Sequence, residues 1–568
     1  MAEAYSDNTT NNRQTNNSQA GQTAEALHRR FTKLQSNRSV WESHWQEIAD
    51  YCLPRKADIT KKRQEGDKRT ELIFDATAIH AVELLASSLH GMLTNASSPW
   101  FTLAYQDKTL ADNIDAMEWL QTVTTRMYEA FHHSNFQQEV HELYYDLVTF
   151  GTGCIYVESD AKFGLRFSTR HIAEMYITEN SRGIVDTIYR KYKLSARAAA
   201  DDFGLSILPR KIAEAAEKNP LEEFDIMQVI QPREDRQIGK IGQENMPIAS
   251  VHYDPDSKTI LRESGFEEQA FLVCRFLKDS ISTYGRSPAM SCLSDVKMLN
   301  KMSETSIRAA QKLIDPPLMV PDDGFVQPVR TRPGGLNYYR SGTRDRIEPL
   351  QIGANIPVSI NMEEQRRQAI RNAFYVDQLF PPMDAPRKTA TQILGEQESR
   401  MRIMAPVLGR LQAELLQPLI TRSFMLMSRQ GLFAEAPEFL AGMDLDIRYV
   451  SPLAKAQKQG DLESIMRALE VMGQVAQIAP ILDHVDVDGL ADYLLDTLDV
   501  PAVVRKSQSQ MIEEREEQEA QAQEQAQLQE AMAIAQAAGQ AAPALREVAN
   551  FEQQQQTDTG QQTTQAAE

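Results

Sequence analysis

The chain has 568 residues, of which 42% are hydrophobic and 24% are charged, and its 60 Lys and Arg against 79 Asp and Glu give a net charge of −19. This composition is that of a globular protein, and the length predicts two to four domains with a substantial core. It excludes a collagen, a wholly disordered chain and a small disulfide scaffold. No apolar run reaches the roughly 18 residues of a membrane span, and the first residues resemble no secretory signal.

The two ends of the chain have biased compositions. Residues 1–24 are rich in Asn, Thr and Gln, which predicts a disordered arm. Residues 506–568 contain 17 Gln and 14 Ala, and their 11 acidic and 3 basic side chains contribute −8 to the net charge. Ala, Gln and Glu favour helix, so we expect this tail to be helical or disordered.

Residues 25–285 are predicted to start with helices and to continue with strands. Apolar residues at helical spacing predict two short helices over Leu27–Leu53 and three further helices over 75–92, 113–131 and 136–149, with Asp75 as an N-cap. From Gly153 the pattern is that of strands, at 154–157, 165–168, 183–192, 248–253, 259–262 and 270–276. The short connections favour an antiparallel meander.

A different pattern begins after Gly285. Ser287–Ile314 predicts one long helix, because its only proline lies in the first turn, and Asp315–Pro316–Pro317 ends it. The Pro- and Gly-rich residues up to Pro357 predict an extended, turn-rich module without a helix. The remaining expectations are a returning helix at 362–380, a loop at 381–388, a very long helix at 391–430 with kinks at Pro406 and Pro418, and short helices at 455–498.

The sequence contains no familiar catalytic motif. It has no P-loop, H-E-x-x-H, EF-hand loop or G-x-S-x-G, and His132, His133 and His141 lack partners at metal-ligand spacing. The four cysteines form no C-x-x-C pair, which favours reduced thiols. We therefore expect no enzyme, metal or cofactor.

Basic side chains form a stripe along the long predicted helix. At 100° per residue, Lys297, Lys301, Arg308 and Lys312 lie within about 60° of each other, opposite an apolar arc, and Glu304 lies beside them. One interpretation is the solvated face of an amphipathic helix. The other is contact with a polyanion, most simply nucleic-acid phosphates.

Two later segments also carry cations. The Pro- and Gly-rich module combines basic and aromatic side chains, which favour a subunit interface over nucleic-acid binding: Arg330, Arg332, Tyr338, Tyr339, Arg340 and Arg344. The loop 381–388 ends in Arg387 and Lys388, and loops between helices often carry function.

Several motifs, in their order along residues 25–500, resemble one family. They are Trp41–Arg55 (WESHWQEIADYCLPR), Leu89–Phe101 (LHGMLTNASSPWF), Leu299-Asn300-Lys301 through Asp315-Pro316-Pro317-Leu318, Arg332-Pro333-Gly334-Gly335-Leu336-Asn337, Thr389-Ala390-Thr391 and Ser451-Pro452-Leu453-Ala454. This succession is similar to that of portal proteins, the head-to-tail connectors of short-tailed, podovirus-like bacteriophages. The arm and the tail lie outside the resemblance.

The resemblance implies an α+β, helix-dominated portal fold. It implies a wing at 25–285 with helices followed by antiparallel strands, stem helices at 286–314 and 358–380, and a small α/β clip at 315–357. It further implies a tunnel loop at 381–388, a long kinked helix returning to the wing at 389–451, and a helical crown at 452–505.

The same resemblance implies a non-enzymatic virion protein, assembled in the cytoplasm of a bacterial host. Twelve copies would form a ring at one capsid vertex, through which double-stranded DNA is packaged and ejected. The implied partners are the large terminase subunit, which supplies the missing ATPase, head-tail adaptor or tail proteins, and the major capsid and scaffolding proteins.

The resemblance also assigns roles to the basic residues. The stripe Lys297, Lys301, Arg308 and Lys312 would line the channel, Arg387 and Lys388 would belong to the tunnel loop, and the Arg and Tyr residues of 330–344 would form the clip interface. The stripe could instead make salt bridges between subunits, with Glu363 and Glu364 as partners. A structural adaptor or scaffold without a DNA channel is the alternative function.

Overall fold

The computed structural model describes residues 6–61, 64, 66–105, 114–237, 239, 242–319, 336, 338, 348–349, 356–379, 403–435, 437, 445–449 and 465–468. The chain divides into two compact units, one made of residues 1–108 and 119–463 and the other of 109–118 and 464–568. Of the second unit, the described residues are 114–118 and the helical turn 465–468. The predicted tunnel loop and tail, and most of the predicted clip and crown, lie outside the described residues.

The N-terminal helices follow the predicted pattern, with one difference. Helix α1 (Ser6–Cys52) is continuous, whereas two short helices were predicted, and it begins within the segment predicted to be disordered. The short helix η1 (Pro54–Lys56) follows it. The next helices start and end within about two residues of the prediction: α2 (Thr77–Leu93), α4 (Ile114–His133) and α5 (Phe136–Phe150).

A three-stranded sheet follows α5. Strand β2 (Thr152–Asp160) lies between β3 (Gly164–Arg170) and β9 (Phe271–Arg275), and it pairs antiparallel with both. Because β9 arrives from about a hundred residues further along the chain, this sheet is not a simple meander.

The five-stranded sheet confirms the antiparallel meander, since its strands lie side by side in chain order. It consists of β4 (Met175–Glu179), β5 (Val185–Ser195), β6 (Glu223–Pro232), β7 (Ile248–Tyr253) and β8 (Ile260–Phe266). Strand β7 has the predicted bounds, whereas β4, β6 and the short helices α6 (Ala196–Phe203) and α7 (Arg210–Lys218) were not predicted.

Both faces of the five-stranded sheet are buried. On one face, Leu27 and Phe31 of α1 pack against side chains such as Tyr189 and Val229. On the other face, Ile188 and Ile230 join a core cluster with Trp45 of α1 and with apolar side chains of the three-stranded sheet. A separate cluster fixes α6 and α7 over the far end of that second face.

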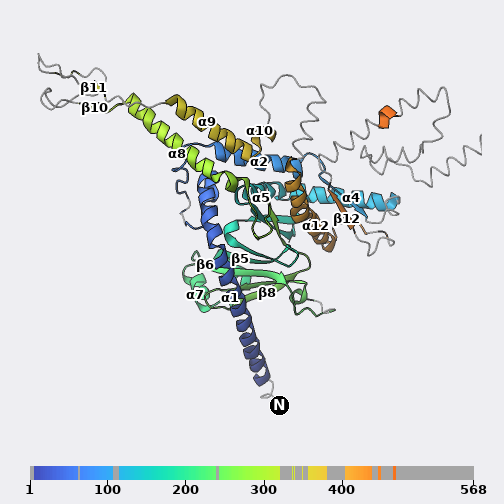
Figure 1. The fold of residues 1–568 in the computed structure, drawn as a ribbon. Coiled ribbons are helices and arrows are strands. Elements are labelled where there is room, and N and C mark those ends of the chain that lie inside the picture. Colours follow the sequence, from blue (N-terminus) through green and yellow to red (C-terminus); the bar gives the residue numbers. More distant parts are fainter. Residues whose placement is uncertain are drawn as a thin grey trace, which may run out of the picture. The chain divides into compact units, whose positions relative to one another are not determined.

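Two long helices run side by side away from the sheets (Figure 1). Helix α8 (Pro288–Ile314) confirms the predicted long helix, and the Ser287 hydroxyl caps it by accepting a hydrogen bond from Met290 N at 3.1 Å. Helix α9 (Ile356–Ala373) starts earlier than predicted and stops before Tyr375, whose φ is +59°. The four-residue helix α10 (Val376–Leu379) follows, and β10 (Leu318–Met319) pairs with β11 (Glu348–Pro349).

The last described helices return to the three-stranded sheet. Residues 403–411 are helical, η4 (Gln412–Leu416) is a turn of π-helix, and α12 (Gln417–Arg429) continues from it with Pro418 in its first turn. The irregular turn thus lies immediately before Pro418, where a kink was predicted. Strand β12 (Leu445–Tyr449) then pairs antiparallel with β1 (Phe101–Tyr105), a strand that was not predicted.

Candidate functional site on the helix pair α8 and α9

The base of α8 is fixed to the N-terminal helices by polar contacts. The Asn300 side chain accepts a hydrogen bond from Phe74 N at 2.7 Å and donates one to Leu72 O. Lys297 pairs with Glu47 of α1, and this contact raises the pKa of the lysine. The part of α8 up to Ser303 is therefore anchored, and its buried residues all lie in this part.

Helices α8 and α9 are antiparallel, and polar contacts between their described side chains join them. Arg366 pairs with Asp295 at 2.8 Å, and the Ser306 hydroxyl donates to Glu363 at 2.6 Å. The hydroxyls of Ser306 and Ser359 are 2.8 Å apart. These contacts define the side of α8 that faces α9.

Arg367 of α9 links the pair to the segment just before α2. Its guanidinium contacts Asp75 at 3.0 Å, Glu363 at 3.1 Å and Glu364 at 3.4 Å. Burial alone would raise the pKa of Asp75, but hydrogen bonds from Thr77 and Arg367 outweigh it and hold that pKa below its usual value. Glu363 and Glu364, considered above as partners between subunits, thus bind an arginine of their own chain.

The basic stripe lies on the side of α8 that faces away from α9. Lys301 and Arg308 are 72% and 70% exposed, and both pair with Glu304, at 2.8 and 2.5 Å. The hydrogen bond from Lys301 lowers the pKa of Glu304. Within the described part of the chain, Lys312 is exposed and has no carboxylate partner. The stripe is therefore basic but partly neutralised.

Apolar side chains are exposed on the two flanks of α8, between the basic stripe and the α9 side. Met298 lies on one flank, at about 100° from Lys297, and Ile307 and Ile314 lie on the other, at about 260° to 280°. Ile314 is 84% exposed. Ile360 and Met362 of α9 are exposed as well. Exposed apolar side chains grouped in this way are typical of interaction surfaces.

The other predicted site residues are mostly outside the described residues. Tyr338 is described and is 72% exposed. The structure does not describe Arg330, Arg332, Tyr339, Arg340, Arg344, Arg387 or Lys388. Their assignment to a clip interface and a tunnel loop stays a prediction.

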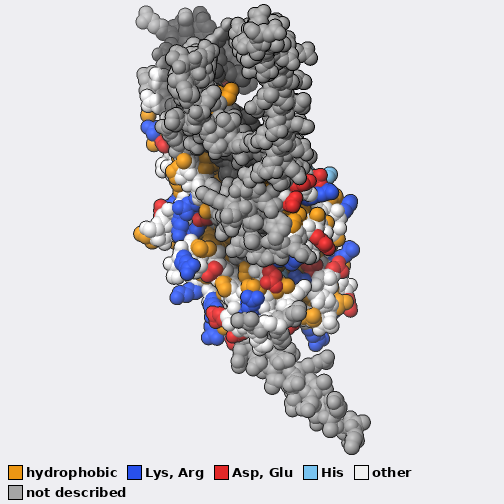
Figure 2. Space-filling model, turned by 90° about the vertical axis from the view of Figure 1, so that its right-hand side faces the viewer, with side chains coloured by type: hydrophobic (Ala, Val, Ile, Leu, Met, Phe, Trp, Pro, Cys, Tyr) orange, Lys and Arg blue, Asp and Glu red, His pale blue; other side chains and the backbone are white. Residues whose placement is uncertain are grey.

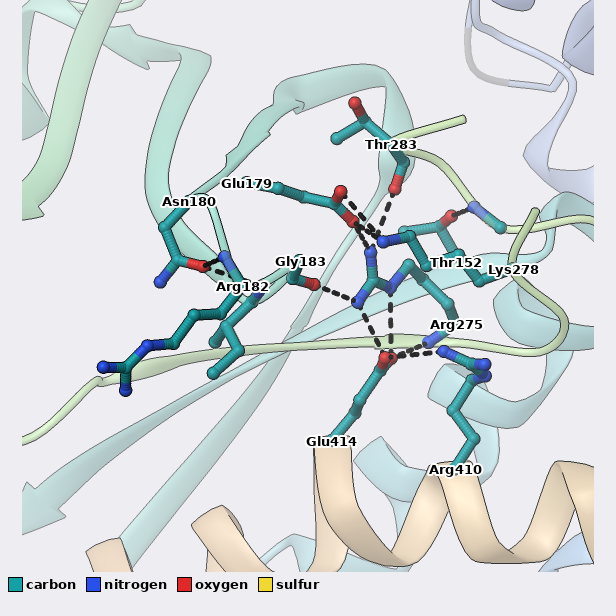
Figure 3. Close-up of polar contacts among 12 residues, drawn as sticks. Thr152, Glu179, Asn180, Arg182, Gly183, Arg275, Lys278, Thr283, Arg410 and Glu414 are labelled. Carbon is teal, nitrogen blue, oxygen red and sulfur yellow. Dashed lines mark hydrogen bonds and ion pairs between the residues drawn. The ribbon is translucent and has the colours of Figure 1, made fainter. Parts of the chain in front are cut away.

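A buried ion-pair network, which no sequence pattern predicted, joins β9 to the helical segment of residues 403–429 (Figure 3). Arg275, which is 3% exposed, donates from Nη2 to Glu414 at 2.7 Å and contacts Glu179 with Nη1. Lys278 pairs with Glu179 at 2.8 Å, and Arg410 pairs with Glu414 at 3.2 Å. Two carboxylates are thus held by three cations around the turn of π-helix.

A second polar junction fixes α12 to the same sheet. Arg422 and Arg429 contact the Glu268 carboxylate at 2.9 and 2.6 Å. Burial raises the pKa of Glu268, but the hydrogen bonds from these arginines outweigh it and lower that pKa overall. Only spatial proximity identifies this junction, because the residues are more than 150 positions apart.

The four buried cysteines are poorly suited to nucleophilic chemistry. Burial raises the pKa of all four cysteine thiols, which makes them poor nucleophiles. Among the described residues there is no group of three potential metal ligands and no helix apolar and long enough to cross a membrane. On the face shown in Figure 2, basic and acidic side chains are interspersed over the described surface.

Comparison with known proteins agrees with this arrangement. The family model described as bacteriophage head to tail connecting protein matches residues 24–505. The portal protein of Salmonella phage epsilon15 is 32% identical over 504 residues, which cover 87% of this chain and 90% of the relative. The probable portal protein of Bordetella phage BPP-1 is 30% identical over 480 residues, which cover 83% and 86%.

A solved structure, the virion of a native gene transfer agent particle, matches with a TM-score of 0.35 and 11% identity, and the match covers 74% of this chain and 95% of that chain. The family match spans most of the chain and includes both α8 and α9. The chain therefore belongs to the head-to-tail connecting proteins of bacteriophages, the portal proteins.

Proposed function

We propose that twelve copies of this chain form a ring at one vertex of a phage capsid, and that double-stranded DNA is packaged and ejected through the ring. In this proposal the protein is assembled in the host cytoplasm and docks the large terminase subunit and later the tail adaptor proteins. It also contacts the major capsid and scaffolding proteins. The observation that carries the proposal is the α8–α9 pair, with a basic stripe on one side and apolar flanks.

The flanks support a closed ring. Each α8–α9 pair exposes apolar side chains on both sides of the plane that contains the stripe and α9, with Met298 on one side and Ile307 on the other. If one flank of each copy contacts the opposite flank of the next copy, the interface is heterologous. Heterologous contacts form a closed ring when the rotations from copy to copy add up to a full turn. When neighbouring copies cover both flanks, the stripe and α9 face opposite ways along the ring radius, one toward the central hole and the other toward the outside. We assign the stripe to the channel.

The dimensions allow a duplex to pass. Twelve α8 helices at about 10 Å spacing form a circle roughly 38 Å across at their axes. Subtracting helix radii of about 5 to 6 Å leaves roughly 27 Å, which exceeds the roughly 20 Å width of double-stranded DNA. The acidic composition fits this use, because a strongly cationic wall would bind phosphates and hold the DNA in place.

The first test is electron microscopy of the purified chain. Rings with a central hole are the expected result, and their symmetry gives the subunit number. Persistent monomers at high protein concentration, with or without capsid and scaffolding proteins, would contradict the ring and favour the structural adaptor without a channel.

The second test reverses a charge of the stripe. Lys312→Glu removes a cation that has no partner among the described residues, so we expect intact rings that package less DNA per particle, because twelve acidic side chains then repel the duplex. Lys33→Glu, at an exposed lysine of α1 that likewise has no carboxylate partner among the described residues, is the matched control. Equal DNA content in both variants would show that the stripe does not face the channel.

A further inference from the structure

A row of polar side chains crosses the second face of the five-stranded sheet. The strand register places Arg190 of β5 opposite Gln228 of β6, Gln228 opposite His252 of β7, and His252 opposite Arg262 of β8. Residues opposite each other in a sheet project from the same face, so all four side chains lie on one face. The row runs between two apolar clusters, one containing Ile188 and Ile230 and the other containing the residues of α6 and α7.

The three-stranded sheet adds a third arginine to this row. Arg170 of β3 lies over the ring of Tyr156 of β2 at 5.7 Å, and the ring of Tyr156 is 6.4 Å from that of Phe266, on β8. Burial lowers the pKa of Arg170, and the Arg190 guanidinium beside it lowers it further. Burial raises the pKa of Tyr192, on whose ring Arg190 lies, and Arg190, Arg262 and Arg170 act in the opposite direction, so guanidinium groups of both sheets lie near this one ring.

The neighbours of these cations are aromatic rather than acidic. Arg190 stacks on Tyr192 at 4.0 Å, and Arg262 lies 5.4 Å from the ring of Phe203. The carboxylate paired with Arg190 is Glu174, at 3.0 Å. Glu174 and Glu158 also act to raise the pKa of Arg170, although burial and Arg190 lower it overall, and Glu158 already lies 3.9 Å from Arg166. Three arginines thus share one directly paired carboxylate among the described residues.

Two polar atoms of this group have no hydrogen-bond partner within the described part of the structure. They are Nε of Arg170 and Nδ1 of His252, and His252 is 4% exposed. Burial, together with Arg262 and Arg190, lowers the pKa of His252 to about 3, so its ring is neutral. A buried polar atom without a partner is costly and marks a place where a missing group would bind.

We propose that Arg170, Arg190 and Arg262, together with His252, bind a small oxyanion of the phosphate class between the two sheets. Planar guanidinium groups match the geometry of phosphate oxygens, and three of them supply more donors than one carboxylate accepts. A phosphate would offset the excess positive charge and accept the hydrogen bonds that are now missing. Arg190 and His252 are too buried to meet a DNA backbone, so the ligand is a free anion rather than nucleic acid.

The test is isothermal titration calorimetry of the assembled full-length protein with inorganic phosphate, in chloride buffer of constant ionic strength. We expect saturable binding of about one phosphate per chain, and a weakening of about tenfold in Arg170→Gln. Because Arg170 is partly buried, Arg262→Gln, at an exposed position on the edge strand β8, is the second variant and is expected to weaken binding in the same direction.

The matched control is Arg182→Gln. Arg182 is an exposed arginine whose side chain points away from the ion-pair network in Figure 3, so its loss changes the net charge equally without touching the site. Unchanged phosphate affinity in this variant, with weakened affinity in the other two, supports the proposal. Absence of saturable binding to the unmodified protein, or the same loss in all three variants, would overturn it.

Discussion

Glu414 is the residue on which the buried network of Arg275 depends most. Its carboxylate accepts hydrogen bonds from the main-chain N–H of Arg275 at 2.9 Å, from Nε at 3.2 Å and from Nη2 at 2.7 Å. Burial alone would lower the pKa of Arg275, but its contacts with Glu414 and Glu179 outweigh it and raise that pKa, so the guanidinium stays charged. A charged group that is 3% exposed needs both carboxylates.

Glu414→Gln is therefore expected to destabilise the chain by about 3 kcal/mol, because it removes one partner of a buried charge. The urea midpoint, followed by tryptophan fluorescence at neutral pH, measures the change. The control is Glu214→Gln in the solvent-exposed pair with Arg210 on α7, which should cost less than about 1 kcal/mol. Similar midpoints for the two variants would show that the buried network contributes no more than a surface pair.

Among the elements, the start of α8 is held in place by the close crossing of two backbones. Gly151 follows α5 and has a φ of +75°, and Gly285 lies against it before α8. A Cβ added to Gly285 would lie 2.1 Å from the Gly151 carbonyl oxygen. Gly285 N also donates to the Thr152 hydroxyl at 2.9 Å, and the Ser287 hydroxyl donates to Thr149 O at 2.8 Å.

Gly285→Ala should thus force α8 away from β2 and lower the thermal midpoint, with a cost of about 1–3 kcal/mol or more from overpacking. Gly409 offers a comparison in which alanine should raise the stability, because a Cβ at this helical position meets nothing within 4 Å. Gly409→Ala is expected to stabilise the chain by about 0.5–1 kcal/mol. Differential scanning calorimetry of both variants measures the two shifts in thermal midpoint. A Gly285→Ala protein as stable as the parent would contradict the close crossing of the two backbones.

Local signals explain which elements could be predicted from the sequence. Ser287 and Pro288 mark the start of α8, and the alternating residues of β7 lie between turn signals, so both elements were predicted closely. The break at Tyr375 has no local signature, whereas the turn of π-helix at η4 ends just before Pro418, where the sequence predicted a kink. The pairings of β1 with β12 and of β2 with β9 join residues far apart in the chain, which no local pattern reveals.

In the candidate site, too, contacts within one helix could be predicted from the sequence, whereas contacts between elements could not. Helical periodicity alone placed Lys301, Arg308 and Glu304 side by side, and the structure pairs them. It could not reveal that Lys297 contacts Glu47, or that Asn300 holds residues 72–75, because these partners lie on other elements. The Arg275 network depends on three distant segments and was equally inaccessible.

At the scale of the whole molecule, the exposed apolar residues of α8 give the assembly its most direct test. Ile307 and Ile314 lie on the same flank, beyond the last buried residue of the helix, so neither contributes to the core of the single chain. If neighbouring copies cover this flank, a carboxylate at both positions places buried like charges in every interface of the ring. Removing each such charge from water is costly, so the interface is destabilised.

The double variant Ile307→Asp and Ile314→Asp is thus expected to keep the fold of the subunit, seen as an unchanged circular dichroism spectrum, while mass photometry shows mostly single chains in place of rings. The matched control is Leu221→Asp, at a leucine that is 82% exposed between α7 and β6. This control loses an apolar side chain about as exposed as that of Ile314, away from α8, and should assemble normally. Rings formed equally well by both variants would place the subunit contacts elsewhere on the chain and would separate the α8 flanks from assembly.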